Sequence, residues 1–172
     1  YTFCMCPGGY VVAAASEEGG VVTNGMSYSG RGGENANSAL LVGVSPEDFP
    51  YPGALGGMYW QREIEQRAYK AAGGAYRAPS ETVGKFLRKD EKTALTPSYA
   101  PETAFCDLND VLPERVTRTM REALEVFDKK LHGFAAPDAV LTAPETRSSS
   151  PVRILRGAER QSAICGLYPC GE

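Results

Sequence analysis

The sequence predicts an α+β fold: a mostly antiparallel sheet built from the N- and C-terminal segments, with a helical subdomain inserted between them. Two observations support this prediction. Short apolar runs with strand character gather in residues 1–48 and again in residues 135–172. Residues 49–134 instead carry apolar side chains at the helical spacing of three and four. We therefore expect residues 1–172 to be a single domain, excised from a longer protein, with a helical insert.

The N-terminal part begins with a predicted β-hairpin. Residues 9–15 form its first strand and residues 20–24 return as the second. Two acidic residues and two glycines at 17–20 supply the turn, because glycine adopts positive φ at little steric cost. A polar, glycine-rich loop at 27–37 separates the hairpin from a further buried strand at 38–44.

The first predicted helix spans residues 58–72. Trp60, Ile64 and Ala68 lie on one face of it, which is the pattern of an amphipathic helix. Two glycines at 73–74 end the helix, since glycine readily adopts the left-handed conformation of a helix C-terminus.

The clearest helix runs from Pro113 to Leu131. Proline suits the first turn, where the N–H that it lacks would have no intrahelical partner. Its apolar side chains form a continuous stripe: Leu112, Val116, Met120, Leu124, Phe127 and Leu131. Lys129 and His132 complement the negative end of the helix dipole, and Gly133 is the predicted C-terminal cap.

The remaining elements are shorter. We expect a small helix capped by Ser80 and a long ordered loop at 89–105, where prolines interrupt any regular pattern. The tail then returns to strands, predicted at 139–142, 152–155 and 163–168.

Composition and charge disfavour several classes of protein. A net charge of −3 offers no general attraction for phosphate backbones, so we expect no nucleic-acid partner. The longest apolar runs, at 11–15 and 38–42, are too short to span a membrane. Five cysteines without a C-x-x-C pair, and a single histidine, predict reduced thiols in a cytoplasmic protein and no metal site.

Three segments together resemble a known family. They are residues 3–12 with 22–27, residues 145–154, and residues 166–172. The last is similar to the G-L-[YF]-x-x-G-[ED] strand of two-dinucleotide-fold flavoproteins, in which the acidic residue, here Glu172, contacts the flavin cofactor. As a set, the segments resemble the uncharacterised FAD-dependent, or NAD(FAD)-utilising, dehydrogenases, distant relatives of fumarate-reductase-type flavoproteins.

The resemblance implies that the intact protein binds FAD through a flanking Rossmann domain of the same polypeptide. This region would be the central domain that caps the flavin and shapes the substrate side. The implied activity is hydride transfer through FAD on a small-molecule substrate of unknown identity; if that substrate carries an anionic group, Arg147 would bind it. The G-x-G-x-x-G fingerprint is absent from the sequence, so we expect no cofactor bound to these residues alone. The alternative is a non-catalytic binding or interaction module on a flavoprotein-derived fold.

Cys6, Pro7, Gly8 and Gly9 form the first candidate flavin-facing segment. The two glycines would let the backbone approach a planar ring closely. The structural alternative is a simple turn that opens the hairpin.

Arg147 with Ser148 and Ser149 forms the second candidate segment. A guanidinium binds carboxylates, phosphates or a reduced flavin in a forked geometry, and neighbouring hydroxyls satisfy further acceptors. The alternative is a solvated loop before an edge strand. Arg147 is also a weak candidate for catalysis, as is Tyr28, whose phenol would donate a proton from the polar loop. The alternative for that loop is a surface connection.

Four charged residues of the first helix are assigned a structural role. Arg62, Glu63, Glu65 and Arg67 are expected to form a solvated helix face, because such charges usually pair along the surface of a helix.

Overall fold

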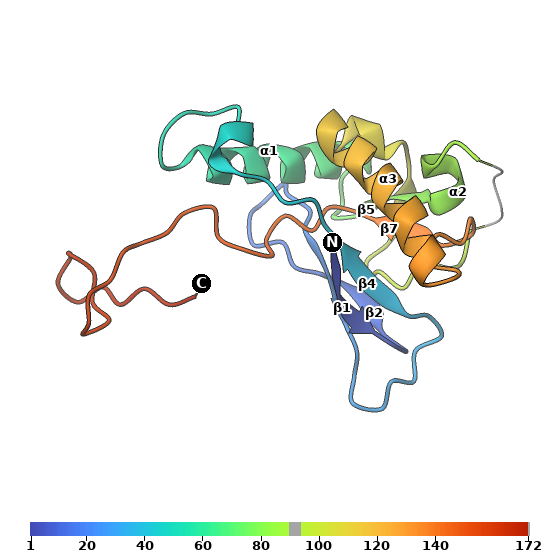
Figure 1. Cartoon of the computed structure of the whole chain (residues 1–172), viewed down its shortest axis with the longest axis horizontal. Helices are drawn as coiled ribbons and strands as arrows, with labels where there is room; N and C mark the ends of the chain where they lie inside the picture. Colours follow the sequence, from blue (N-terminus) through green and yellow to red (C-terminus); the bar gives the residue numbers. More distant parts are fainter. Residues whose placement is uncertain (90–93, 172) are drawn as a thin grey trace.

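The computed structural model describes residues 1–89 and 94–171 and has an α+β fold (Figure 1). The predicted fold class is thus confirmed. In chain order the elements are β1 (Thr2–Cys6), β2 (Tyr10–Ala13), β3 (Thr23–Met26), β4 (Asn37–Leu40), α1 (Gly56–Ala71), β5 (Ala78–Thr82), α2 (Val83–Phe86), β6 (Thr103–Phe105), α3 (Glu114–Lys130) and β7 (Val140–Thr142), with 3₁₀ turns at Pro46–Asp48 and Leu108–Asp110.

The predicted hairpin is confirmed as the antiparallel pair β2–β3, in which Tyr10 faces Met26 and Ala13 faces Thr23. Its second strand is Thr23–Met26, however, and begins three residues later than the strand predicted at 20–24. The strand predicted at 38–44 is the shorter β4. It pairs with β1, a strand that the sequence pattern did not single out, and the register shifts between Phe3 and Cys6. These two pairs are separate two-stranded sheets.

Two strands of a third sheet, β5 and β6, lie within the region predicted as a helical insert. Its central strand β5 runs parallel to β6 and antiparallel to β7, the strand predicted at 139–142. All five residues of β5 are buried, so the strand lacks the alternation of apolar and polar residues that marks a half-buried strand. Ser80 is therefore not a helix cap but the middle of β5. Thr82 caps α2 instead, where its hydroxyl accepts a hydrogen bond of 3.3 Å from Lys85 N.

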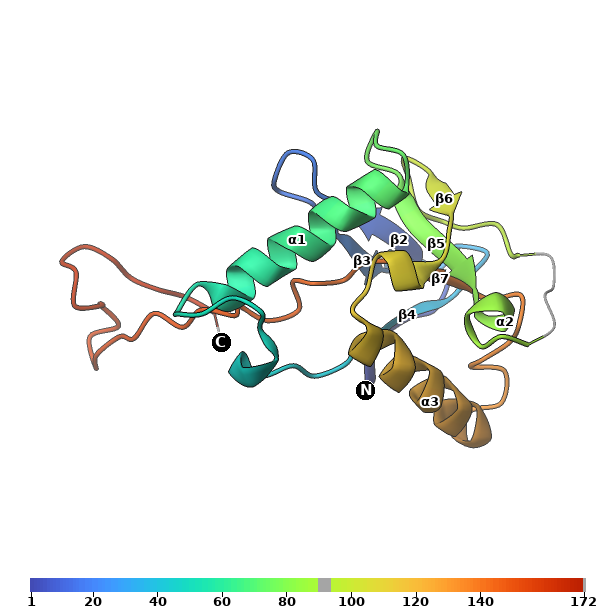
Figure 2. The ribbon, with the colours of Figure 1, turned by 90° about the horizontal axis from the view of Figure 1, so that it is seen from above.

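Both long helices are confirmed. In Figure 2, α1 passes in front of β2 and β3, whereas α3 lies beside β4. Ala68 of α1 belongs to a core cluster that includes Val21 and Ala78, so the helix packs on the hairpin and on β5. Met120 and Leu124 of α3 pack in a second core cluster, whose buried members also include Val83, Phe86, Leu108 and Ala143.

The C-terminal tail differs from the prediction. Residues 152–155 and 163–168 form no strand, and the segment after about residue 150 extends away from the rest of the chain (Figures 1 and 2). Apolar side chains such as Leu155 and Ile164 are exposed there, by 76% and 67%. A strand needs a neighbour to accept its hydrogen bonds, and the described part of the chain offers the tail none.

Candidate functional site

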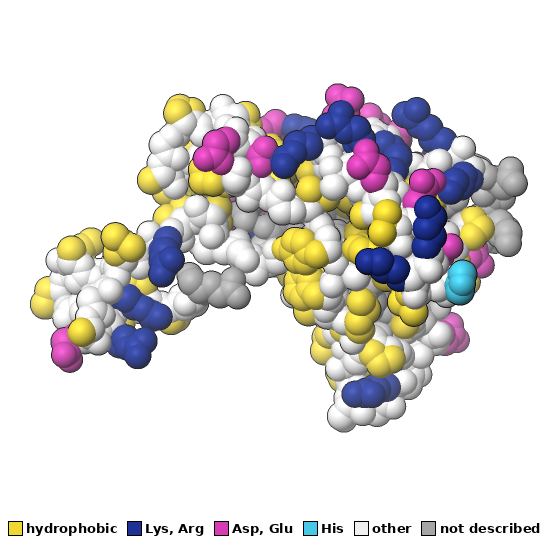
Figure 3. All heavy atoms as spheres, in the orientation of Figure 1, with side chains coloured by type: hydrophobic (Ala, Val, Ile, Leu, Met, Phe, Trp, Pro, Cys, Tyr) yellow, Lys and Arg dark blue, Asp and Glu magenta, His cyan; other side chains and the backbone are white. Residues whose placement is uncertain are grey.

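A cleft of about 830 Å³ lies between the β1–β4 pair, α3, the N-terminal end of α1 and the segment that follows β7. Its lining is mostly apolar and includes Phe49, Trp60, Leu112, Met120 and Leu141. Figure 3 shows hydrophobic side chains gathered on this face of the molecule, beside the N-terminal strand and over α3. The size and apolar character suit an organic ligand.

The cleft brings together parts of both predicted flavin-facing segments. Cys6 and Pro7 lie on its wall, and so do Ser148 and Ser149 from the opposite end of the chain. Direct contact of these residues with a cofactor stays a prediction. Glu172, the remaining cofactor candidate, lies outside the described residues.

Gly8 and Gly9 pack against the loop that follows the hairpin. Gly8 has a φ of +55°, and a Cβ placed there would lie 1.9 Å from the carbonyl oxygen of Arg31. Gly33 N donates to Gly8 O at 3.0 Å, and Gly9 N donates to Asn35 O at 2.9 Å. The fold itself therefore requires the two glycines, whether or not a ring approaches them.

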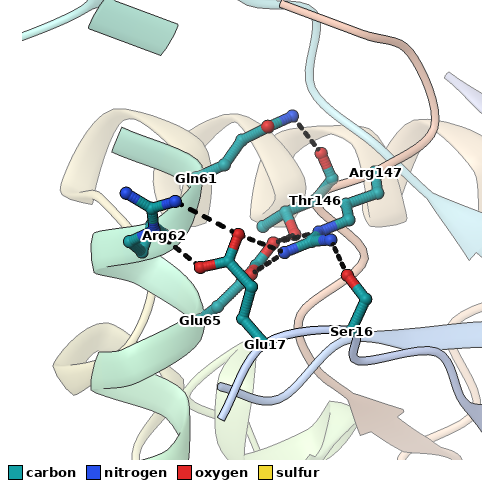
Figure 4. A network of polar contacts seen from close by, with 7 residues as sticks. All are labelled: Ser16, Glu17, Gln61, Arg62, Glu65, Thr146 and Arg147. Carbon is teal, nitrogen blue, oxygen red and sulfur yellow. Dashed lines mark hydrogen bonds and ion pairs between the residues drawn. The ribbon is translucent and has the colours of Figure 1, made fainter. Parts of the chain in front are cut away.

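Arg147 makes a forked contact with Glu65 of α1 (Figure 4). Arg147 Nε donates to Glu65 Oε1 at 2.8 Å and Nη2 donates to Oε2 at 2.6 Å, while Nη1 donates to Ser16 Oγ. The hydrogen bonds to Glu65 raise the pKa of the Arg147 guanidinium above its usual value. Arg147 was expected to bind a ligand, yet three of its nitrogens already donate to protein oxygens.

Glu65 corrects the expectation of a solvated helix face. Its side chain is buried, with 1% of the residue exposed, because the segment after β7 covers this side of α1. Its neighbours fit the expectation better: Glu63 and Arg67 form an ion pair of 2.6 Å one helical turn apart, and both side chains are 39% exposed. The spacing along the helix could not separate Glu65 from these residues, because its partner is far away in the sequence.

Further contacts extend this network to the turn of the hairpin. Arg62 Nε donates to Glu17 Oε2 at 2.6 Å, and this bond lowers the pKa of Glu17. Thr146 Oγ1 donates to Glu65 Oε1 at 2.6 Å, and Gln61 Nε2 donates to Thr146 O at 2.7 Å. The network therefore fixes residues 146–147 against α1, directly beside the cleft.

Glu145 is a lining residue that the sequence did not distinguish from its segment. Within the described lining it is the one carboxylate, and that lining contains no Lys, Arg or His side chain. Burial raises the pKa of Glu145. One feature of the sequence could have distinguished Glu145: it stands between the apolar Pro144 and the polar pair Thr146 and Arg147, which bind α1.

Tyr28, the second weak catalytic candidate, lies on the surface. It is 65% exposed and stacks edge-on against Tyr10, with ring centroids 5.8 Å apart. A catalytic role for Tyr28 stays a prediction.

All five cysteines are free. Among the described residues, no group of three His, Cys, Asp or Glu is arranged to hold a metal ion. No helix in that part of the chain is both long enough and apolar enough to cross a membrane.

One comparison with known proteins identifies a family, and another identifies a longer relative. A family model described as "FAD-dependent protein, C-terminal domain-like" matches residues 1–148. An uncharacterised protein of Clostridium beijerinckii is 52% identical over 176 residues, which cover the whole of this chain and 33% of that relative. This chain thus spans a third of the relative's length. The match to the family model shows that this chain is a domain of an FAD-dependent protein family.

The finer expectations are not tested by these matches. The family description places the matched region in a C-terminal-like domain, whereas we expected a central cap domain. The relation to fumarate-reductase-type flavoproteins, the dehydrogenase activity and the cytoplasmic location stay predictions.

Proposed function

Because this chain belongs to the family of FAD-dependent proteins, as their C-terminal-like domain, we propose that it forms the substrate-side wall of the flavin site in an oxidoreductase. The cleft carries this proposal. It brings Cys6 and Pro7 together with Ser148 and Ser149 on one apolar surface, although these residues come from opposite ends of the chain. Such a surface orients a ligand and keeps water away from the reacting atoms.

The lining of the cleft fits one part of FAD better than the other. The flat ring system suits apolar walls, whereas a pyrophosphate needs cationic side chains or backbone N–H groups at a helix N-terminus. The described lining offers no Lys, Arg or His side chain. We therefore assign the pyrophosphate to a flanking Rossmann domain of the same polypeptide. The relative is about three times as long as this chain, and a polypeptide of that length can include such a domain.

When bound, FAD supplies hydride transfer, and the residues of this chain supply orientation. Arg147 acts as a positioning residue. Its fork on Glu65 holds the segment that carries Ser148 and Ser149 against α1. In this role Arg147 shapes the wall without touching the ligand.

The extended tail supports the same arrangement. Exposed apolar side chains of the tail, including Leu155, Ile164 and Tyr168, gain burial if the tail packs on the FAD-binding domain.

Flavin content tests the proposal. We expect the longer natural polypeptide, purified from cells, to be yellow and to carry about one FAD per chain, and the 172-residue chain alone to be colourless. A colourless longer protein that cannot be reconstituted with FAD would refute the proposal and favour the non-catalytic binding module. Stoichiometric FAD on the 172-residue chain alone would refute the assignment of the pyrophosphate to another domain.

The contribution of the wall is tested by Arg147→Ala in the longer protein, with Lys89→Ala as the control. Loss of the fork should loosen the wall and let iodide quench the flavin fluorescence more strongly, whereas the FAD content stays the same. Lys89 forms an exposed ion pair with Glu125, so its removal should leave the quenching unchanged. Equal quenching in both variants and the parent would contradict the proposed position of this domain.

A further inference from the structure

Glu145 is held in a fixed position at the wall of the cleft. On one side, Pro144 O accepts hydrogen bonds from Thr23 N at 2.8 Å and from Thr23 Oγ1 at 3.1 Å. On the other side, Thr146 is bound to Gln61 and to the buried Glu65. These contacts anchor the backbone of Glu145 to β3 and to α1, so that Glu145 lines the cleft from a rigid support.

The carboxylate has no partner of its own in the part of the chain that the structure describes: no hydrogen bond or ion pair there involves it. Other acidic groups do have partners. Glu17 binds Arg62, and Glu63 binds Arg67 and Tyr51. Glu145 is half-buried, and this partial burial without a compensating contact disfavours the charged carboxylate and raises the pKa of Glu145.

The neighbouring charges do not compensate Glu145. The network on the far side of residues 144–147 contains two carboxylates, Glu17 and Glu65, and two guanidinium groups, Arg62 and Arg147. Two negative and two positive charges cancel within the network. Among the described lining residues, the cleft therefore has the negative charge of Glu145 and is otherwise mostly apolar.

We propose that Glu145 is the recognition group of the cleft and that the substrate is an apolar molecule with a cationic group, such as an ammonium. This inference rests on the proposed function, since it names the substrate class of the same wall. A cation pairs with Glu145 where the apolar surroundings strengthen the attraction. An anion would be repelled by the Glu145 carboxylate, and the described lining offers it no Lys, Arg or His side chain as a partner. The negative charge of the cleft therefore favours a cationic substrate over the anionic one considered from the sequence.

The test uses the longer holoprotein and three probes of one shape: 4-phenylbutylammonium, 4-phenylbutanol and 4-phenylbutyrate. Calorimetry and flavin difference spectra give their dissociation constants. We expect the ammonium probe to bind at least about tenfold more tightly than the butyrate, because a charge-assisted hydrogen bond contributes at least that ratio. Equal or tighter binding of the butyrate would overturn the inference.

Glu145→Gln identifies the responsible side chain. The variant should lose about tenfold in affinity for the ammonium probe and less than about threefold for the alcohol. Glu18→Gln, which removes an exposed carboxylate from the hairpin turn, should change neither affinity. An unchanged ammonium affinity in Glu145→Gln would also overturn the inference.

Flavin content is measured first on each preparation. Wild-type protein without FAD refutes the proposed function itself. Protein that keeps FAD but shows no preference for the cation refutes this inference alone.

Discussion

Arg147 binds Glu65 through two parallel hydrogen bonds, 2.8 Å from Nε to Oε1 and 2.6 Å from Nη2 to Oε2. The glutamate comes from the middle of α1 and the arginine from the coil after β7. The Glu65 side chain is buried, whereas a third of the Arg147 side chain is exposed. Arg147 therefore covers the Glu65 carboxylate and separates it from water. This pair is the chief polar link between α1 and the wall of the cleft.

Arg147→Ala should lower the free energy of unfolding by about 3 kcal/mol, because it leaves the buried Glu65 without its compensating charge. Urea denaturation of the 172-residue chain measures the effect. The control is Lys89→Ala, which breaks an ion pair whose side chains are 58% and 55% exposed and should cost less than about 1 kcal/mol. Similar losses in both variants would contradict the structural weight given to the Arg147 fork.

Leu124→Ala should destabilise the chain by about 3 kcal/mol, since it opens a cavity in the core between α3 and α2. Leu124 is 1% exposed, whereas Val126 on the same helix is 47% exposed. Val126→Ala should therefore change the stability by less than about 0.5 kcal/mol. Thermal denaturation of both variants checks the orientation of α3, and equal effects would show that the helix faces another way.

Gly8→Ala should cost more than about 1 kcal/mol, because the new methyl group would meet the carbonyl of Arg31 at a backbone conformation that disfavours side chains. Gly30→Ala is the matched control. No described atom lies within 4 Å of the Cβ position of Gly30, so its stability should stay within about 0.5 kcal/mol of the parent. Chemical denaturation separates the two variants, and a harmless Gly8→Ala would show that the 31–35 loop does not pack there.

Glu145→Gln should stabilise the chain in a way that depends on pH. Burial raises the pKa of Glu145 in the folded chain above its value in the unfolded chain, so the folded state holds this proton more tightly. Wild-type stability therefore falls as the pH rises from the unfolded pKa through the folded pKa, and the variant lacks this fall.

We compare the free energy of unfolding of Glu145→Gln with that of the wild type. The variant should gain more at pH 7 than below about pH 4, where the Glu145 carboxyl is protonated in the folded and the unfolded chain. Urea midpoints across this range, with Glu18→Gln in parallel, measure it. A difference that does not change with pH would mean that Glu145 is as well solvated as the exposed Glu18.

The sequence by itself determined the local elements with strong periodicity. The stripes around Ala68 and Leu124 predicted α1 and α3, and the glycines between two apolar runs predicted the β2–β3 hairpin. These features depend on residues a few positions apart, and such short-range spacing is legible in the sequence.

Only the tertiary structure decided which charges are buried and what lines the cleft. Glu65 has the local pattern of a surface residue, yet Arg147, distant in the sequence, brings it into the interior. The buried strand β5 lacks the alternation of apolar and polar residues that would mark it in the sequence. Its pairing with β6 and β7 in the structure identifies it as a strand. The cleft, in whose described lining Glu145 is the one carboxylate, likewise depends on segments that meet only after folding. Contacts over such separations leave no periodic signal along the chain.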